Sequence, residues 1–381
     1  MTRLKVTLFS KYSRMGASSR LRSMQYLPLL AAHGIDVEVC ELFPDAYLQA
    51  RYGGSAFSAK KHVLKYYWRR AVQLFRVSPG SVLWIEAELF PYLPYWLESL
   101  LRRSAAPFVA EYDDALFHNY DLSPRALVRR LLGRKIDRVM QHATCVIAGN
   151  GYLAARATQA GASRVELIPT VVDHRRYAEV VHGERAQTVI GWVGSPATQK
   201  YLLDIRHALA AVCAKHDARL LLVGANAQMV EGLAGIPVEL AAWSEETEAA
   251  TIARMDIGIM PLIDGPWERG KCGYKLIQYM ACGLPVVASP VGVNVDIVRQ
   301  GENGYLATDD AAWEDAMQRL VKDASLRQRM GHAGREQVER EYSVAAQAPR
   351  LAAVLRSLAQ SDVAPSGVAS PRVGHSDMGS R

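Results

Sequence analysis

The sequence predicts an α/β protein of two Rossmann-like domains, each a doubly wound, mainly parallel sheet, facing each other across a cleft. Short β-branched and apolar runs alternate with amphipathic helical stretches in the first half, and the alternation restarts in the second. The 381 residues are enough for two domains. A composition of 50% apolar and 22% charged residues excludes a wholly disordered or fibrous chain.

The first half is expected to open with a strand over 4–9 and a helix over 18–32, whose apolar residues recur at helical spacing. Gly34 ends this helix. Further strands are predicted at 35–40, 81–86, 107–112, 143–149 and 165–169, with helical stretches between them.

A strand over 188–195 and a helix over 201–215 open the second half. Further strands are predicted at 218–225, 256–262 and 284–290, and helical stretches from 311 to 359. We therefore divide the chain into domains over 1–172 and 173–360, with the last helix a candidate to cross back to the first domain. Residues 361–381 are small and polar without periodicity, which indicates a disordered tail.

Composition also restricts the compartment. No run approaches the ~18 apolar residues of a membrane-spanning helix, and charges within the first apolar stretch lead us to expect no signal peptide. The five cysteines are scattered and lack metal-ligand spacing, so reduced thiols are expected rather than disulfides or a zinc site. These features predict a cytoplasmic protein.

The positive charge is concentrated in the first half. Residues 1–182 carry 25 Lys and Arg against 15 Asp and Glu, whereas residues 183–381 carry 20 against 23. A basic half suits nucleic acid, an anionic membrane surface or a phosphorylated ligand. Because no nucleic-acid-binding module is recognisable, nucleic acid is not expected as a partner.

One basic and aromatic stretch, residues 58–77, suits an anionic membrane surface. Its alternative is a solvated helix whose aromatic side chains pack on the sheet. A later basic run would extend the surface: Arg129, Arg130, Arg134, Lys135 and Arg138. Under the first interpretation the protein is peripheral on the inner face of the cytoplasmic membrane.

Two loops between a strand and a helix are candidate phosphate sites. In the first, Gly16 would let backbone approach a ligand and Arg20 adds charge; the alternative is a turn with a serine N-cap. The second has Gly194 and Ser195, with Lys200 in the next helix; the alternative is an ordinary turn with a surface lysine. Neither loop is a G-x-G-x-x-G or Walker A motif, which argues against dehydrogenases and NTPases.

The stretch over 265–294 is the most informative. Arg269, Lys271 and Lys275 lie within seven residues, around two glycines, at the approach to a helix. Such an arrangement can hold two phosphates without a metal ion. Gln278 follows Lys275 by one helical turn, so both side chains can face one ligand.

The end of this stretch, Gln278-Tyr279-Met280-Ala281-Cys282-Gly283-Leu284-Pro285-Val286-Val287-Ala288-Ser289, fits the signature E-x-M-A-x-G-x-P-V-V-A-S. The chain thereby resembles the retaining glycosyltransferases of family 4, which have the GT-B fold. Other family features follow in order: the Gly16 loop, the hinge from Ile168 to Asp173, Gly194 and Ser195 with Lys200, and Val291 with Gly292. The resemblance covers roughly residues 3–358.

The resemblance implies transfer of a sugar, with retained anomeric configuration, from a nucleotide-diphosphate sugar to a glycan or lipid-linked acceptor. The donor is a co-substrate, and neither a cofactor nor a metal is expected, because cations would neutralise the leaving diphosphate. The chain departs from the family's E-x7-E pair, whose positions fall on Gly270 and Gln278. Glu268 is the nearest substitute for the first glutamate. The alternatives are a non-catalytic binding subunit and a nucleotide-sugar epimerase on the same scaffold.

An acidic cluster, Glu111 to Asp114, ends a strand of the first domain. Asp113 or Asp114 could accept a proton from an acceptor hydroxyl or bind sugar hydroxyls; the alternative is that one of them caps a helix. The candidate catalytic residues are Asp113, Asp114, Lys200 and Lys275. The candidate donor-binding residues are Gly16, Arg20, Gly194, Ser195, Arg269, Lys271, Gln278 and Gly292.

Overall fold

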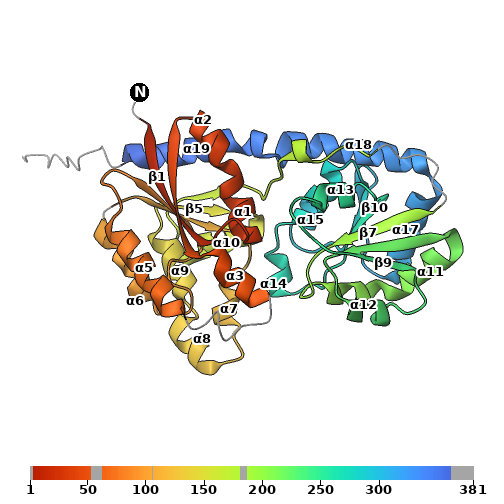
Figure 1. The fold of residues 1–381 in the computed structure, drawn as a ribbon, viewed down its shortest axis with the longest axis horizontal. Coiled ribbons are helices and arrows are strands. Elements are labelled where there is room, and N and C mark those ends of the chain that lie inside the picture. The colour runs from red at the N-terminus through yellow and green to blue at the C-terminus, as the bar shows by residue number, and fades with distance from the viewer. Residues whose placement is uncertain (1–2, 53–61, 105, 181–186, 362–381) are drawn as a thin grey trace, which may run out of the picture.

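The computed structural model describes residues 3–52, 62–104, 106–180 and 187–361. They form two six-stranded parallel sheets in two lobes that lie side by side (Figure 1). The predicted class, two doubly wound α/β domains, is confirmed. The expected disordered tail lies, apart from Ser361, outside the described residues.

The first sheet has the strand order β2-β1-β3-β4-β5-β6. Its strands are β1 (Leu4–Tyr12), β2 (Ile35–Phe43), β3 (Val82–Glu86), β4 (Phe108–Tyr112), β5 (Cys145–Ala148) and β6 (Val165–Leu167). Its longer helices are α3 (Asp45–Tyr52), α5 (Val63–Phe75), α8 (Ala126–Leu132), α9 (Lys135–His142) and α10 (Gly151–Ala160). The β3 and β4 side chains are buried on both faces of the sheet, as expected for central parallel strands.

The second sheet has the order β12-β11-β10-β7-β8-β9. Its strands are β7 (Thr188–Val193), β8 (Ala218–Val223), β9 (Val238–Ala241), β10 (Ile257–Met260), β11 (Val286–Ala288) and β12 (Gly304–Leu306). Its helices include α11 (Arg206–His216), α12 (Ala227–Gly232), α13 (Glu248–Ile252), α14 (Pro266–Arg269), α15 (Tyr274–Ala281), α17 (Asp310–Lys322) and α18 (Ala324–Glu341). The sequence did not predict β9 and β12, because both are edge strands of three or four partly exposed residues.

The helix expected over 18–32 is broken into α1 (Ala17–Arg22), a 3-10 turn (Met24–Tyr26) and α2 (Leu27–Ala32). Ser23 stands at the break with φ −127°. Its hydroxyl donates to the carboxylate of Glu86 at the end of β3, at 2.5 Å. A hydrogen bond to the sheet thus interrupts a stretch whose apolar spacing alone suits one helix.

The chain crosses between the domains twice, at adjacent places. Val172 and Ser343 form a parallel bridge, where the linker meets the end of α18. The last helix, α19 (Val344–Ser361), then runs back along the first domain (Figure 1). There Leu351 and Leu355 pack into the same core as Trp84 of β3.

Two cations expected on the basic surface are buried instead. Arg70 on α5 donates to the backbone carbonyls of Ser10 and Cys40. Lys135 on α9 forms ion pairs with Glu88 and Glu98 at 2.7 and 3.0 Å. Their positive charges balance polar groups of the interior, so they do not belong to a membrane-facing surface.

Candidate active site

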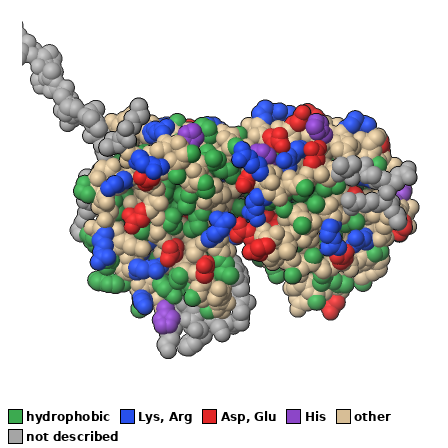
Figure 2. Space-filling model, turned by 45° about the horizontal axis from the view of Figure 1, so that its top comes forward, with side chains coloured by type: hydrophobic (Ala, Val, Ile, Leu, Met, Phe, Trp, Pro, Cys, Tyr) green, Lys and Arg blue, Asp and Glu red, His purple; other side chains and the backbone are tan. Residues whose placement is uncertain are grey.

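A cavity of about 250 Å³ lies between the domains, at the carboxyl ends of their strands. Asp113 and Asp114 line it from the first domain, and Lys271 and Lys275 line it from the second. Charged side chains of both signs gather where the two lobes meet (Figure 2). The structure therefore brings together four of the predicted residues from segments about 160 positions apart.

Lys275 lies in the first turn of α15, with its ammonium nitrogen 4.5 Å from the centre of the Trp192 ring. Burial, and secondarily the nearby charge of Lys271, lower the pKa of Lys275 to about 7. Gly194 leaves room for this side chain, because a Cβ there would lie 3.0 Å from the lysine nitrogen and 2.2 Å from the Trp192 ring. An anion in the cavity would reverse the pKa shift and hold the lysine protonated.

The two aspartates follow β4. Burial, and then the charge of Asp113, raise the pKa of Asp114. Capping does not explain either carboxylate, since the next described helix, α7 (His118–Asp121), has Phe117 at its N-cap. The alternative of a capping role is therefore wrong, and both aspartates remain available to a ligand in the cavity.

Gly270, at the position of the first family glutamate, packs directly on the first domain. A Cβ there would lie 2.5 Å from the Cβ of Ala115 and 2.8 Å from its backbone nitrogen. The Asn150 side chain donates to the carbonyls of Gly270 and Lys271, both at 2.9 Å. No larger side chain fits at 270 while these contacts hold.

Glu268 does not take the place of that glutamate. Its carboxylate is buried within the second domain and accepts a hydrogen bond from the hydroxyl of Tyr201. The suggestion of a shifted loop that brings Glu268 to the ligand is therefore wrong for this arrangement.

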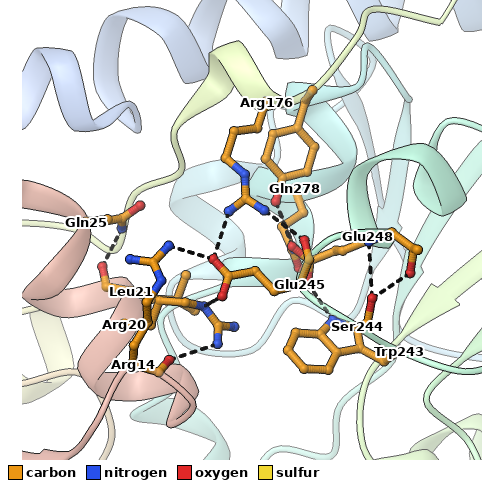
Figure 3. Close-up of polar contacts among 12 residues, drawn as sticks. Arg14, Arg20, Leu21, Gln25, Arg176, Trp243, Ser244, Glu245, Glu248 and Gln278 are labelled. Carbon is orange, nitrogen blue, oxygen red and sulfur yellow. Dashed lines mark hydrogen bonds and ion pairs between the residues drawn. The ribbon is translucent and has the colours of Figure 1, made fainter.

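Gln278 is buried and bonded internally. Its amide donates to the hydroxyl of Tyr177 at 3.2 Å, and that hydroxyl donates to Glu248 at 2.9 Å. Glu248 also accepts from the indole of Trp243, at 2.6 Å (Figure 3). Gln278 thus joins α15 to the interdomain linker, and its predicted contact with the donor remains a prediction.

Arg20 takes part in an ion cluster between the domains. Glu245 of the second domain lies 2.8 Å from Arg14, 3.6 Å from Arg20 and 3.4 Å from Arg176 of the linker (Figure 3). Arg20 is buried and lies over the Trp243 ring, 5.3 Å from its centre. It lines a second interdomain cavity of about 310 Å³, which shares Leu21 and Tyr274 with the main cavity but is not lined by Lys271 or Lys275.

The other predicted residues are not among those that line the main cavity. Lys200 is exposed, with its nitrogen 5.1 Å from the centre of the Tyr201 ring. Arg269 is exposed and paired with Asp264 at 2.6 Å. The remaining three are Ser195, which is exposed; Gly16, whose Cβ would meet Tyr12 at 2.3 Å; and Gly292, at φ +55°. Their roles with the donor remain predictions.

Glu86 is a site residue that the sequence analysis missed. Its buried carboxylate accepts from the backbone of Lys11 at 2.9 Å and from the hydroxyls of Ser19 and Ser23 at 2.6 and 2.5 Å. It therefore fixes the first loop against β3. An acid at the end of an otherwise apolar strand was the signal that could have indicated it.

Within the described residues, no group of three His, Cys, Asp or Glu side chains is placed to hold a metal ion. In the same part of the chain, no helix is long and apolar enough to cross a membrane.

Two facing parallel-sheet domains, with a last helix that returns to the first, define the GT-B fold. Sucrose-phosphate synthase from Thermosynechococcus elongatus aligns over 94% of this chain and 100% of its own, with a TM-score of 0.72 and 19% identity. Anabaena Alr3699/HepE, solved in complex with UDP-glucose, aligns over 93% and 100%, with a TM-score of 0.64 and 17% identity. These likenesses confirm the fold.

The family model described as "Glycosyl transferases group 1" matches residues 187–323. N-acetyl-alpha-D-glucosaminyl L-malate synthase of Bacillus anthracis is 30% identical over 151 residues, which are 38% of this chain and 38% of that relative. The chain thus aligns with well under half the length of that relative. These findings confirm the predicted resemblance to the family 4 glycosyltransferases.

Proposed function

We propose that this protein is a retaining, metal-independent glycosyltransferase that moves a sugar from a nucleotide-diphosphate sugar to a glycan or lipid-linked acceptor. The observation that carries the proposal is the placement of Lys271 and Lys275 opposite Asp113 and Asp114 in one interdomain cavity. This placement suits a donor diphosphate on one side and an acceptor hydroxyl on the other.

In the proposed reaction, the bond between the anomeric carbon and the diphosphate oxygen breaks, and a bond from the acceptor oxygen to that carbon forms. Lys271 and Lys275 would stabilise the negative charge that develops on the leaving diphosphate. The acceptor proton would pass to the leaving diphosphate or to the Asp113–Asp114 pair. Attack on the face from which the leaving group departs follows from the family resemblance.

The proposed donor class has support from two sources. The complex of Anabaena Alr3699/HepE with UDP-glucose has the same fold. In this chain, Lys275 is poised to take up a proton when a diphosphate binds, since its pKa lies near 7.

The proposed setting is cell-surface polysaccharide or glycoconjugate synthesis, at the inner face of the cytoplasmic membrane. On α5, Leu64, Trp68 and Phe75 are 83%, 73% and 68% exposed. On α8, Leu127 and Leu131 are 67% and 63% exposed, beside the exposed Arg130. Exposed apolar side chains among cations on one domain suit the surface of an anionic bilayer.

The test is thermal-shift binding of UDP, GDP and ADP and their glucose or mannose conjugates, without and with magnesium. We expect one nucleotide to raise the melting temperature without metal, and Lys275→Ala to abolish that rise. Free nucleotide diphosphate should then be released from its sugar only when an acceptor is present. Binding without such release would support a non-catalytic subunit, and binding of no nucleotide would contradict the proposal.

A further inference from the structure

A third and much smaller cavity adjoins the main one within the first domain. It has a volume of about 30 Å³ and shares Ser18 and Asp113 with the main cavity. This volume accommodates one water-sized group, such as a hydroxyl. Its other lining residues are Lys11, Arg22, Glu86, Ala87, Glu111 and Leu116.

Glu111 in this cavity is incompletely hydrogen-bonded. The residue is 4% exposed, and one carboxylate oxygen pairs with Arg22. Arg22 is held in turn by the Thr170 hydroxyl at 3.0 Å and the Ile168 carbonyl at 2.9 Å. The other oxygen, Oε2, has no hydrogen-bond partner among the described residues. A buried polar atom without a partner destabilises the folded protein, and a hydrogen-bond donor on a ligand would remove that penalty.

Glu86, on the neighbouring strand, shows the contrast. Both of its carboxylate oxygens accept hydrogen bonds, from the backbone of Lys11 at the end of β1 and from the hydroxyls of Ser19 in α1 and Ser23 just after it. Its role is therefore to position those segments, and Glu111 is left as the carboxylate that can accept from a ligand. Burial raises the pKa of Glu111 to about 7, with Arg22 acting in the opposite direction.

We infer that this cavity binds a non-reacting hydroxyl or hydroxymethyl group of a neutral sugar acceptor, which donates a hydrogen bond to Glu111 Oε2. The inference rests on the proposed function and names its acceptor class. Asp113 lines both this cavity and the main one, so an acceptor anchored at Glu111 presents a second hydroxyl to Asp113 at the edge of the main cavity.

The charges around the cavity select against an anionic acceptor group. Glu86, Glu111 and Asp113 supply three carboxylates, whereas Lys11 and Arg22 supply two cations, and Arg22 is already paired with Glu111. A phosphate would have to approach the unpartnered carboxylate oxygen, and like charges at close range in a buried site repel strongly. Neutral sugars should therefore bind more tightly here than their phosphates.

The test measures affinity by saturation-transfer NMR, with whichever of UDP, GDP and ADP binds present in excess. The neutral probes are the methyl α-glycosides of glucose, galactose, mannose and N-acetylglucosamine; the anionic probes are glucose 6-phosphate and mannose 6-phosphate. We expect at least one neutral glycoside to bind, and Glu111→Gln to weaken it by about tenfold or more. The nucleotide affinity should change less than about twofold, because Glu111 does not line the main cavity, where the donor is proposed to bind.

Two further variants separate the site from a folding defect. Leu116→Trp fills the small cavity from its half-buried rim, leaves the Arg22–Glu111 pair intact, and should also abolish glycoside binding. Glu166→Gln is the matched control for Glu111→Gln, because it removes a carboxylate on β6 of the same domain that pairs with an arginine, Arg164. It should leave glycoside binding unchanged.

Three results would overturn the inference while nucleotide binding persists. The first is that no glycoside binds to the unaltered protein. The second is that a glycoside binds but neither Glu111→Gln nor Leu116→Trp weakens its binding, as expected if the cavity holds only water. The third is that a sugar phosphate binds more tightly than the neutral glycosides. Failure of every nucleotide to bind would instead contradict the proposed function.

Discussion

At the proposed donor site, the lowered pKa of Lys275 predicts that diphosphate binding depends on pH, and it sets the direction of that dependence. In the free protein its pKa is lowered to about 7, so the amine loses its proton as the pH rises through neutrality. A bound diphosphate requires the ammonium form, so binding above pH 7 must take up a proton, and affinity must fall as pH rises. The ordinary lysine pKa near 10.4 would give no such fall below pH 9.

The magnitude follows from the fraction protonated. With a pKa near 7, the free amine is about one quarter protonated at pH 7.5 and about one hundredth at pH 9. The affinity should therefore fall about 25-fold, or about 1.9 kcal/mol, over this interval. The terminal phosphate, with a pKa near 6, is already ionised at pH 7.5 and contributes little to the change.

Isothermal titration calorimetry with UDP, or with whichever nucleoside diphosphate binds, measures the affinity at both pH values. Titrations in two buffers of different ionisation enthalpy should also report the uptake of nearly one proton at pH 8.5. In Lys275→Arg the guanidinium stays charged throughout, so the fall should disappear whatever the absolute affinity. An equal fall in the unaltered protein and in Lys275→Arg, or a constant affinity in both, would refute the reasoning.

Three further predictions test the domain contacts and the surface. Gly270→Ala should weaken domain closure by about 1–3 kcal/mol, because the added methyl group clashes with Ala115. Small-angle X-ray scattering should then report a larger radius of gyration. Gly151→Ala is the control: an added Cβ there meets nothing within 4 Å, so the radius should not change. Glu245→Ala should have a smaller effect of about 1 kcal/mol on closure, since the Glu245 side chain is 22% exposed and water screens its ion pairs. High salt should mimic this substitution in the unaltered protein but add nothing in the variant. Trp68→Glu should reduce sedimentation with phosphatidylglycerol vesicles several-fold, whereas Val230→Glu on the second domain should not; equal loss in both variants would contradict a membrane surface on α5.

The sequence predicted both sheets because their central strands are continuous apolar runs between turn residues, a pattern that survives without tertiary information. It located the main cavity for a related reason: ligands bind at the carboxyl ends of parallel strands, and both Asp113 and Lys275 follow such ends. It did not predict that Arg20 pairs with Glu245, because that contact depends on how the domains pack. Nor did it predict the burial of Lys135, because its partners Glu88 and Glu98 come from a different loop and helix of the first domain and meet it only in the folded chain.

The glycine at position 270 links the chain's departure from the E-x7-E pattern of the family that it resembles to its domain interface. A glutamate at position 270 would clash with Ala115, so one of the two segments would have to move. That movement would strain the two hydrogen bonds by which the Asn150 side chain holds the carbonyls of Gly270 and Lys271. Those two hydrogen bonds set the backbone from which Lys271 extends into the cavity. The absence of a glutamate side chain at position 270 is therefore what allows the first domain to approach so closely. In the proposed reaction, groups that contact the transferred sugar would then come from other residues around the cavity, and on the first domain Asp113 and Asp114 are the acids that line it.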